Sequence, residues 1–258
     1  HMNEGHAALL VLELLRQNRK GTSAVLGFDD VRKRCVFTTH TPVPAGHDQF
    51  SYELFARVAG EPLGTEVTHM LGGRDRLNMT LLALNMSHYV NGVAKKHGEV
   101  SREMFTQYPI DSITNGVHSR TWTCESFARL YDRHIPGWVN DPFSLRYAIG
   151  IPTEEIRDAH AQAKTGLIEE VANRTGLSLR SDVLTIGLAR RATAYKRAGL
   201  LFHDSGQLAD IAETLGPIQV LFAGKAHPKD SGGKDLIRRV VAAAKDLKDR
   251  VAVAYLEN

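Results

Sequence analysis

The chain has 258 residues, 43% of them hydrophobic and 24% charged, which indicates a globular protein with one large core or two modest ones. Its 32 basic and 29 acidic residues leave a net charge of only +3, so no global field attracts nucleic acid or a membrane surface. The two cysteines, Cys35 and Cys124, lack paired spacing and fit a reduced, cytoplasmic protein, and no apolar run approaches the roughly 20 residues of a membrane span.

The first half of the chain combines helical stripes with short apolar runs. Prolines remove backbone donors from the turn at 41–47, so no regular element is expected there. A turn at 115–118 ends this half, and we place an interdomain crossing near residue 115. The other expected elements are a helix at 7–15, a strand at 35–39, a helix at 49–58, a helical region at 77–105 interrupted near Asn91-Gly92, and a short run at 112–114.

The second half ends in the alternation of strands and helices that is typical of a parallel sheet with crossover helices. In one helix, Glu154 and Glu155 near the start and Arg174 near the end match the helix dipole, and Thr153 is the expected cap. The expected elements are helices at 125–131, 141–147 and 153–174, a strand at 183–189, a helix at 196–215, a strand at 218–223, a helix at 233–248 and a strand at 251–256.

Each of these three strands ends in polar or charged residues suited to binding an anionic sugar derivative. Ligands of such sheets lie at the carboxyl ends of the strands, so the three endings are expected to converge on one crevice. The endings are Arg190-Arg191-Ala192-Thr193-Ala194-Tyr195-Lys196-Arg197, Gly224-Lys225-Ala226-His227-Pro228 and Glu257-Asn258.

The first ending gives the strongest signal. Lys196 and Arg197 are expected in the first turn of a helix, where cations oppose the dipole unless an anion lies between them and the helix end. Arg191 offers a planar, bidentate fork and Lys196 a compact point charge, a set suited to phosphate. A solvated basic loop is an equally good interpretation of the four cations taken alone.

Other polar residues have plain structural interpretations. His40 after a buried strand, Asn115-Gly116 as a turn and Trp122 as a core anchor each need no ligand when they are taken singly. Glu4 with His1 and His6 lacks the spacing of two histidines on one helix face, so no metal is assigned.

Seven ordered motifs resemble the alpha-glucan phosphorylases of the shorter bacterial and archaeal branch, and together they cover nearly the whole chain. They are His1-x-Asn3-Glu4-Gly5-His6, Thr39-His40-Thr41-Pro42-x-Pro44-Ala45-Gly46-His47-Asp48, Asn91-Gly92-Val93-Ala94, Thr114-Asn115-Gly116-Val117-His118 with Trp122, Arg191-x-x-x-Tyr195-Lys196-Arg197, Gly224-Lys225-Ala226-His227-Pro228 and Tyr255-Leu256-Glu257-Asn258.

The resemblance implies an α/β fold of the GT-B type, with two Rossmann-like domains that are each only partly present. Residues 1–115 would be the C-terminal part of a glucan-binding domain, and residues 116–258 the first part of a domain that binds cofactor and phosphate. It also implies phosphorolysis of terminal alpha-1,4 bonds with inorganic phosphate, which releases glucose 1-phosphate with retention. The implied cofactor is pyridoxal phosphate, whose phosphate exchanges a proton with the substrate phosphate.

The resemblance also implies roles for individual residues of this chain. By resemblance, His40 and Asn115 bind the sugar at its 6-hydroxyl, Arg191 and Lys196 bring the substrate and cofactor phosphates together, and Arg190 lies beside the cofactor phosphate. The remaining matches are Trp122 packing near the cofactor, Tyr195 supporting the Lys196 loop, and Lys225 and Glu257 at the cleft.

One departure concerns the cofactor lysine, which the family carries in a segment expected beyond Asn258. Both termini look cut, so we expect this piece to hold no covalent cofactor and to show no turnover. The alternatives are a GT-B nucleotide-sugar glucosyltransferase and a noncatalytic glucan-binding fragment. The sequence leaves open whether the chain forms a homo-oligomer.

Overall fold

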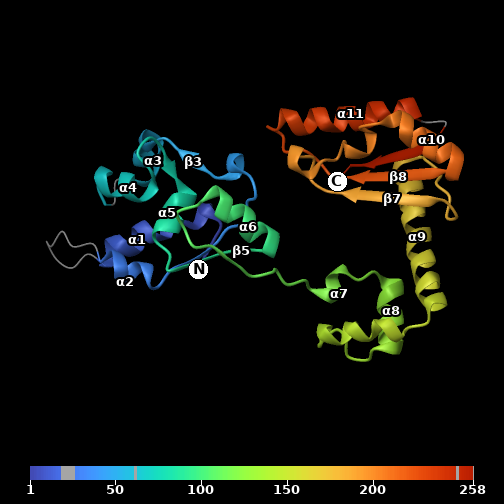
Figure 1. Cartoon of the computed structure of the whole chain (residues 1–258), viewed down its shortest axis with the longest axis horizontal. Helices are drawn as coiled ribbons and strands as arrows, with labels where there is room; N and C mark the ends of the chain where they lie inside the picture. The colour runs from blue at the N-terminus through green and yellow to red at the C-terminus, as the bar shows by residue number, and fades with distance from the viewer. Residues whose placement is uncertain (19–26, 61–62, 248–249, 258) are drawn as a thin grey trace. The chain divides into compact units, whose positions relative to one another are not determined.

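A computed structural model describes residues 1–18, 27–60, 63–247 and 250–257. The chain divides into two compact units, His1–Val117 and His118–Asn258, and the division lies close to the predicted crossing near residue 115. The architecture is mixed α/β with parallel sheets in both units (Figure 1). Within the described residues, no helix is both long and apolar enough to cross a membrane.

The first unit is built on a four-stranded parallel sheet in the order β1-β2-β5-β6. Its strands are β1 (Met2–Asn3), β2 (Val36–Thr38), β5 (Tyr89–Gly92) and β6 (Asp111–Ser112), and β3 (Gln49–Phe50) pairs antiparallel with β4 (Leu77–Asn78). Its helices are α1 (Leu9–Asn18), α2 (Phe28–Arg32), α3 (Tyr52–Ala59), α4 (Thr65–Gly72), α5 (Met79–Asn85) and α6 (Lys95–Met104), with short 3-10 turns at Gly5–Ala7 and Pro44–Gly46.

Two predicted helices of this unit are wrong in part. The segment predicted as one helix at 49–58 begins with β3, and Ser51 then caps α3 by accepting a hydrogen bond from the Leu54 amide at 3.2 Å. The interruption predicted near Asn91-Gly92 is the strand β5, which lies inside the sheet. Gly92 is needed there because a Cβ would lie 2.9 Å from the His97 Nδ1 and 3.1 Å from the Gly98 amide.

The second unit opens with a small helical subdomain. It contains α7 (Ser119–Trp122), α8 (Glu125–His134), a 3-10 segment at Pro142–Gly150 and the 23-residue helix α9 (Thr153–Thr175). Trp138 is fully buried against α8 and donates from Nε1 to the Asp132 carboxylate at 2.8 Å.

Two predictions for this subdomain need correction. The segment predicted as a helix at 141–147 is a 3-10 segment in the structure. Thr153 is the first residue of α9, not its cap, because Pro152 occupies the cap position.

The rest of this unit is a three-stranded parallel sheet in the order β7-β8-β9, with helices packed on both faces (Figure 1). The elements are β7 (Leu184–Ala189), 3-10 turns at Ala194–Lys196 and Leu200–Phe202, α10 (Ser205–Leu215), β8 (Ile218–Ala223), α11 (Ser231–Leu247) and β9 (Val251–Leu256).

Alternation along β8 explains why both faces are covered. Val220 and Phe222 point to one face and pack with residues of α10 and α11. Leu221 points to the other face and packs with Val171 of α9. A strand buried on both sides reads as a continuous apolar run, which is why the sequence predicted residues 218–223 as a strand and the structure confirms those bounds.

The structure corrects the basic segment after β7. Lys196 ends a 3-10 turn and Arg197 follows it with a left-handed φ of 53°, so neither residue lies in the first turn of a helix. α10 begins only at Ser205, where the Asp204 carboxylate caps the Gln207 amide at 2.8 Å. The argument from the helix dipole therefore does not apply to Lys196 and Arg197. The last residue of the helix predicted at 233–248 lies outside the described residues.

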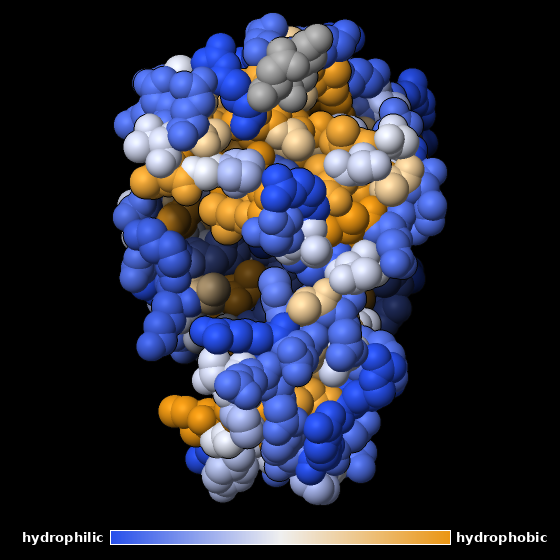
Figure 2. Space-filling view, turned by 90° about the vertical axis from the view of Figure 1, so that its right-hand side faces the viewer, coloured by the Kyte–Doolittle hydropathy of each residue, from blue (hydrophilic) through white to orange (hydrophobic). Residues whose placement is uncertain are grey.

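The β7 edge of this sheet exposes apolar side chains. Leu184 of β7 is 63% exposed, and Ile186 of the same strand is 36% exposed. Figure 2 shows hydrophobic residues gathered over the part of this unit that carries the sheet and its helices. Among the residues that the structure describes, β7 pairs with β8 on one side and with no strand on the other.

Candidate functional site

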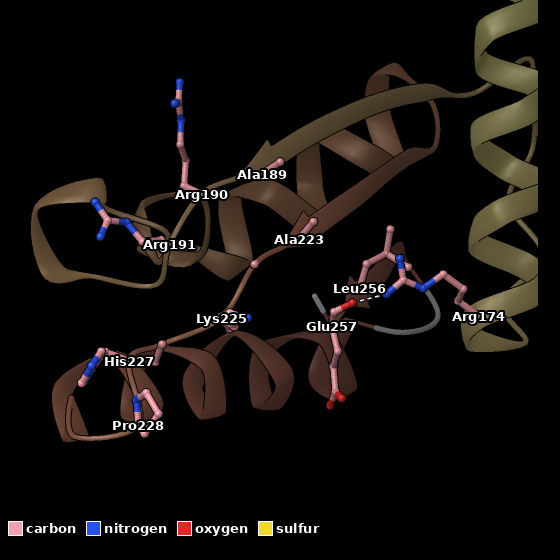
Figure 3. Close-up of a pocket in the computed structure, with 12 residues that line it drawn as sticks. Arg174, Ala189, Arg190, Arg191, Ala223, Lys225, His227, Pro228, Leu256 and Glu257 are labelled. Atoms are coloured by element: carbon pink, nitrogen blue, oxygen red, sulfur yellow. Dashed lines mark hydrogen bonds between the residues drawn. The ribbon is translucent and has the colours of Figure 1, made fainter. Parts of the chain in front are cut away.

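The carboxyl ends of β7, β8 and β9 surround a hollow of about 580 Å³ (Figure 3). Parallel pairing in register places Ala189, Ala223 and Leu256 side by side, so the residues that follow them come together. The first residues of the three polar endings, at 190–191, 224–228 and 257, therefore meet at one edge as predicted, whereas Lys196 and Arg197 of the first ending lie at another hollow. The lining of the hollow at this edge includes Arg174, Arg190, Arg191, Gly224, Lys225 and Glu257.

Backbone hydrogen bonds fasten these loops to one another. The Arg190 amide donates to the Ala223 carbonyl at 3.0 Å, and the Ala192 amide donates to the Lys225 carbonyl at 3.1 Å. The Tyr255 hydroxyl donates to the Gly224 carbonyl at 2.7 Å. The base of the hollow is therefore built from main-chain atoms held by the sheet, while the charged side chains extend from it.

Positive charge dominates the lining. Arg190 and Arg191 leave the end of β7 in different directions, and Lys225 follows β8 (Figure 3). Among the described residues, none of these three cations has a carboxylate within salt-bridge distance. Unpaired guanidinium and ammonium groups at the carboxyl edge of a parallel sheet are suited to binding an anion.

Glu257 and Arg174 form the opposite side of the hollow. The Arg174 guanidinium reaches from α9 to donate to the Glu257 carbonyl (Figure 3). Arg174 also lies 3.8 Å from the Glu170 carboxylate. The sequence treated Arg174 only as a helix-terminal cation, and its place beside the crevice was missed because nothing local predicts that α9 packs against β9. Asn258 lies outside the described residues.

Lys196 does not line this hollow. It lines a second, largely apolar hollow of about 700 Å³ beside β7 and α10, together with Arg197. Its ammonium lies 4.5 Å from the centre of the Tyr195 ring, a cation–π contact. Arg190, Arg191 and Lys225 thus all line one hollow, although the Arg190 side chain points away from the other two (Figure 3), and Lys196 lines a neighbouring hollow.

In the first unit, polar residues at the ends of β1, β2 and β5 line an open hollow of about 500 Å³. His40 and Asn115, both selected from the sequence, line it together, so the structure brings these two side chains to one surface. The other polar lining residues are His1, Asn3, Thr38, Tyr89 and Asn91. The Asn115 amide donates to the Val93 carbonyl at 3.0 Å, which fixes its loop beside the end of β5.

Glu4 holds the His40 segment in place. Its carboxylate accepts from the His40 amide at 2.7 Å, from the Thr41 hydroxyl at 2.9 Å and from the Gly5 amide at 3.1 Å. Glu4 also has a positive φ of 73°, which is uncommon for a residue with a Cβ. The sequence placed Glu4 in the first family motif and assigned it no metal, and its contacts with the His40 segment were not predicted.

Trp122 is not a core anchor. It ends the short helix α7 and is 79% exposed, whereas Trp138 is the buried tryptophan of the same unit. The interpretation of Trp122 as a structural residue is therefore wrong.

Comparisons with known proteins match the whole chain. Residues 64–258 match the model of the carbohydrate phosphorylase family. The chain is 34% identical to the glycogen phosphorylase of Aquifex aeolicus, covering 100% of the chain and 43% of that relative. It is 36% identical to the maltodextrin phosphorylase of Thermococcus litoralis, covering 98% of the chain and 34% of that relative. The chain thus spans less than half the length of these curated relatives. It belongs to the carbohydrate phosphorylase family.

Proposed function

We propose that this chain is part of an alpha-glucan phosphorylase of GT-B architecture, which cleaves terminal alpha-1,4 bonds with inorganic phosphate and releases glucose 1-phosphate. The observation that carries the proposal is a set of three cations, Arg190, Arg191 and Lys225, that have no carboxylate partner among the described residues and follow the carboxyl ends of strands in the second sheet of a member of the carbohydrate phosphorylase family. A phosphate substrate needs such a set, and a hydrolase that uses water does not.

The two units would bind different parts of the substrate. In the first unit, His40 and Asn115 share one polar hollow and are proposed to bind sugar hydroxyls. In the second, Arg191, with its bidentate fork, is proposed to bind the substrate phosphate, and Lys225 and Glu257 are proposed to contact the substrate. Cations fixed beside the phosphate stabilise the charge that develops as the glycosidic bond breaks through a transition state with oxocarbenium character.

Pyridoxal phosphate is the cofactor proposed for the whole protein. It carries a phosphate monoester, and the donor set at the end of β7 fits such a group because Arg190 is a guanidinium without a carboxylate partner in the described part of the chain. Trp122 offers an exposed aromatic face for packing beside the cofactor. When bound, the cofactor supplies a phosphate that exchanges a proton with the substrate phosphate. For Lys196 to join this set, its side chain would leave the Tyr195 ring.

Phosphate binding to the chain tests the cationic hollow directly. Titration with inorganic phosphate, followed by the amide signals of residues 190, 191 and 225, should show saturable shifts. Arg191→Gln removes the fork and should weaken binding about tenfold, as expected for one charge-assisted hydrogen-bonded pair. Arg238→Gln is the matched control, because Arg238 is exposed on α11 and already pairs with Asp235. Equal binding by the two variants would contradict the assignment of Arg191.

Turnover is tested on the whole protein that contains this chain, reconstituted with pyridoxal phosphate. Glucose 1-phosphate should form from maltodextrin only when inorganic phosphate is present. Affinity for a nucleoside diphosphate glucose without phosphate-dependent cleavage would instead indicate a glucosyltransferase. Retained oligosaccharide binding with no response to phosphate would indicate a noncatalytic glucan-binding protein.

A further inference from the structure

The ring of His40 is held by a single neighbour in the described part of the chain. Its Nε2 lies 2.5 Å from the Oδ1 of Asn3, the last residue of β1. An amide oxygen only accepts hydrogen bonds, so Nε2 must carry the proton. His40 Nδ1 has no hydrogen-bond partner among the described residues. In the neutral ring it is therefore a free acceptor on an exposed side chain that lines the polar hollow.

Glu4, the residue after Asn3, fixes the backbone of His40. The Glu4 carboxylate accepts from the His40 amide and from the Thr41 hydroxyl, at 2.7 and 2.9 Å. Asn3 and Glu4 are adjacent in sequence, and the unusual φ of 73° at Glu4 lets one side chain reach the ring while the other reaches the main chain. Strained backbone of this kind persists only where the surroundings fix it, and it is common at functional sites.

A similar set of hydrogen bonds fixes the polar groups beside His40. The Thr38 hydroxyl donates to the buried Asn91 Oδ1 at 3.0 Å, so it must accept from the His1 Nε2 at 2.9 Å. The Asn91 Nδ2 donates to the Gly92 carbonyl at 3.0 Å, which fixes the orientation of that amide. The surface beside His40 thus has a defined pattern of donors and acceptors.

We propose that Asn3 and Glu4 are positioning residues for His40: Asn3 keeps the ring in its Nε2–H tautomer, so that Nδ1 accepts a hydrogen bond from a sugar hydroxyl, and Glu4 fixes the backbone that carries the ring. The part that concerns the sugar rests on the proposed function. The part that concerns the tautomer does not, because it follows from the contacts alone. The opposite tautomer would present an N–H at this position, so the sugar hydroxyl would have to accept the hydrogen bond instead of donating it.

The tautomer is measured on the chain itself by long-range proton–nitrogen correlation spectra of the histidine rings. At about pH 8.5, roughly two units above the ordinary histidine pKa, the protonated and unprotonated nitrogens have well-separated shifts. His40→Gln identifies the His40 signals among the 12 histidines. We expect the native chain to show the Nε2–H form, Asn3→Asp to retain it because a carboxylate also accepts, and Asn3→Leu to show a mixture.

The matched control is Asn140→Leu, because Asn140 is an exposed asparagine of the other unit. It should leave the His40 pattern unchanged. A native His40 in the Nδ1–H form, or an Asn3→Leu variant with an unchanged pattern, would overturn the role of Asn3. For Glu4, the Glu4→Ala variant, which removes the acceptor of the His40 amide, should speed hydrogen exchange at that amide about tenfold or more, and Glu103→Ala, at an exposed site on α6, should not. Equal exchange rates would overturn the role of Glu4.

The sugar part is tested on the whole protein. Asn3→Leu should lower kcat/KM for phosphorolysis of maltodextrin about tenfold, the value of one hydrogen bond in the transition state, and Asn3→Asp should restore most of it. If the native protein shows no phosphorolysis, the proposed function fails while the tautomer result stands on its own. If phosphorolysis occurs and Asn3→Leu leaves kcat/KM unchanged, the positioning role fails while the function stands.

Discussion

A Cβ placed on Gly224 would lie 2.2 Å from the carbonyl oxygen of Arg190. The two residues follow neighbouring strands, and this close approach is what allows the Arg190 amide to reach the Ala223 carbonyl. Gly224 also has a φ of 137°, which a residue with a side chain rarely adopts. The position of the cationic loop after β7 therefore depends on a glycine after β8.

The first prediction concerns this glycine. Gly224→Ala should destabilise the second unit by at least about 2 kcal/mol, because it combines a steric clash with an unfavourable φ. It should also weaken phosphate binding by displacing Arg190 and Arg191. The measurements are chemical denaturation followed by tryptophan fluorescence and the phosphate titration described above.

Gly187→Ala provides the control for that substitution. Gly187 lies in β7 of the same sheet, and a Cβ there would meet nothing within 4 Å. Its effect on stability should stay within about 0.5 kcal/mol. Similar effects of the two substitutions would contradict the close approach between Gly224 and Arg190.

A second prediction uses the buried amide of Gln219, which is 3% exposed in the middle of β8. Its side chain accepts from the Arg180 amide at 3.0 Å and donates to the Arg180 carbonyl at 2.7 Å, so it fixes the segment that leads into β7. Gln219→Leu leaves both backbone groups without a partner and should cost roughly 2 kcal/mol of unfolding free energy. Gln207→Leu, at an exposed position of α10, should change it by less than about 0.5 kcal/mol, and equal losses would refute the role of Gln219.

The sequence predicted the second sheet far better than the loops that form its site. Strands buried on both faces produce continuous apolar runs, so residues 218–223 and 251–256 were found with the bounds that the structure shows. Lys196 was misplaced because the helical pattern extends backward from α10 through two short 3-10 turns, and no local residue marks where the α-helix begins except Asp204.

The first sheet was harder to predict because its strands are short and contain polar residues. β5 carries Asn91 and Gly92, which read as a turn in isolation but are needed for the contact with Thr38 and for close packing against α6. Likewise, the contacts of Asn3 and Glu4 with His40 join residues that are 36 or 37 positions apart, so only the fold reveals them. Motif order located His40 and Asn115, while their supporting residues required the structure.

A third prediction concerns the two tryptophans, which both lie in the second unit. Acrylamide should quench Trp122 strongly, because it is exposed, and Trp138 weakly, because it is fully buried. Trp122→Phe should therefore leave a protected, blue-shifted emission, and Trp138→Phe should leave an accessible one. Trp138→Phe should also destabilise the unit by about 2 kcal/mol, since it removes the hydrogen bond to Asp132 and leaves a cavity. Equal quenching of the two single-tryptophan variants would refute these placements.

The last prediction concerns pH and His47, at the end of the loop that begins after His40. Burial lowers the pKa of His47; the charges of Glu4 and Asp48 oppose this shift and that of His97 adds to it. Its Nδ1 contacts the Thr80 hydroxyl at 2.8 Å, and its buried Nε2 has no partner among the described residues, so a proton there would find no acceptor. The folded state therefore binds a proton at His47 less readily than the unfolded chain, in which the pKa of the ring has its ordinary value of about 6.5.

The sign of the pH dependence follows from that difference. Because the unfolded state binds more protons, the contribution of His47 is fully present above about pH 6.5 and is lost progressively as the pH falls below that value. His47→Gln, which can still bond Thr80, should flatten the loss of stability of the first unit between about pH 7.5 and about pH 5. The core methyl signals of Val11 and Leu12 report unfolding of this unit, and His160→Gln, at an exposed position on α9, is the control. An identical pH dependence in the native chain and in His47→Gln would mean that His47 is protonated in the folded state as readily as in the unfolded one.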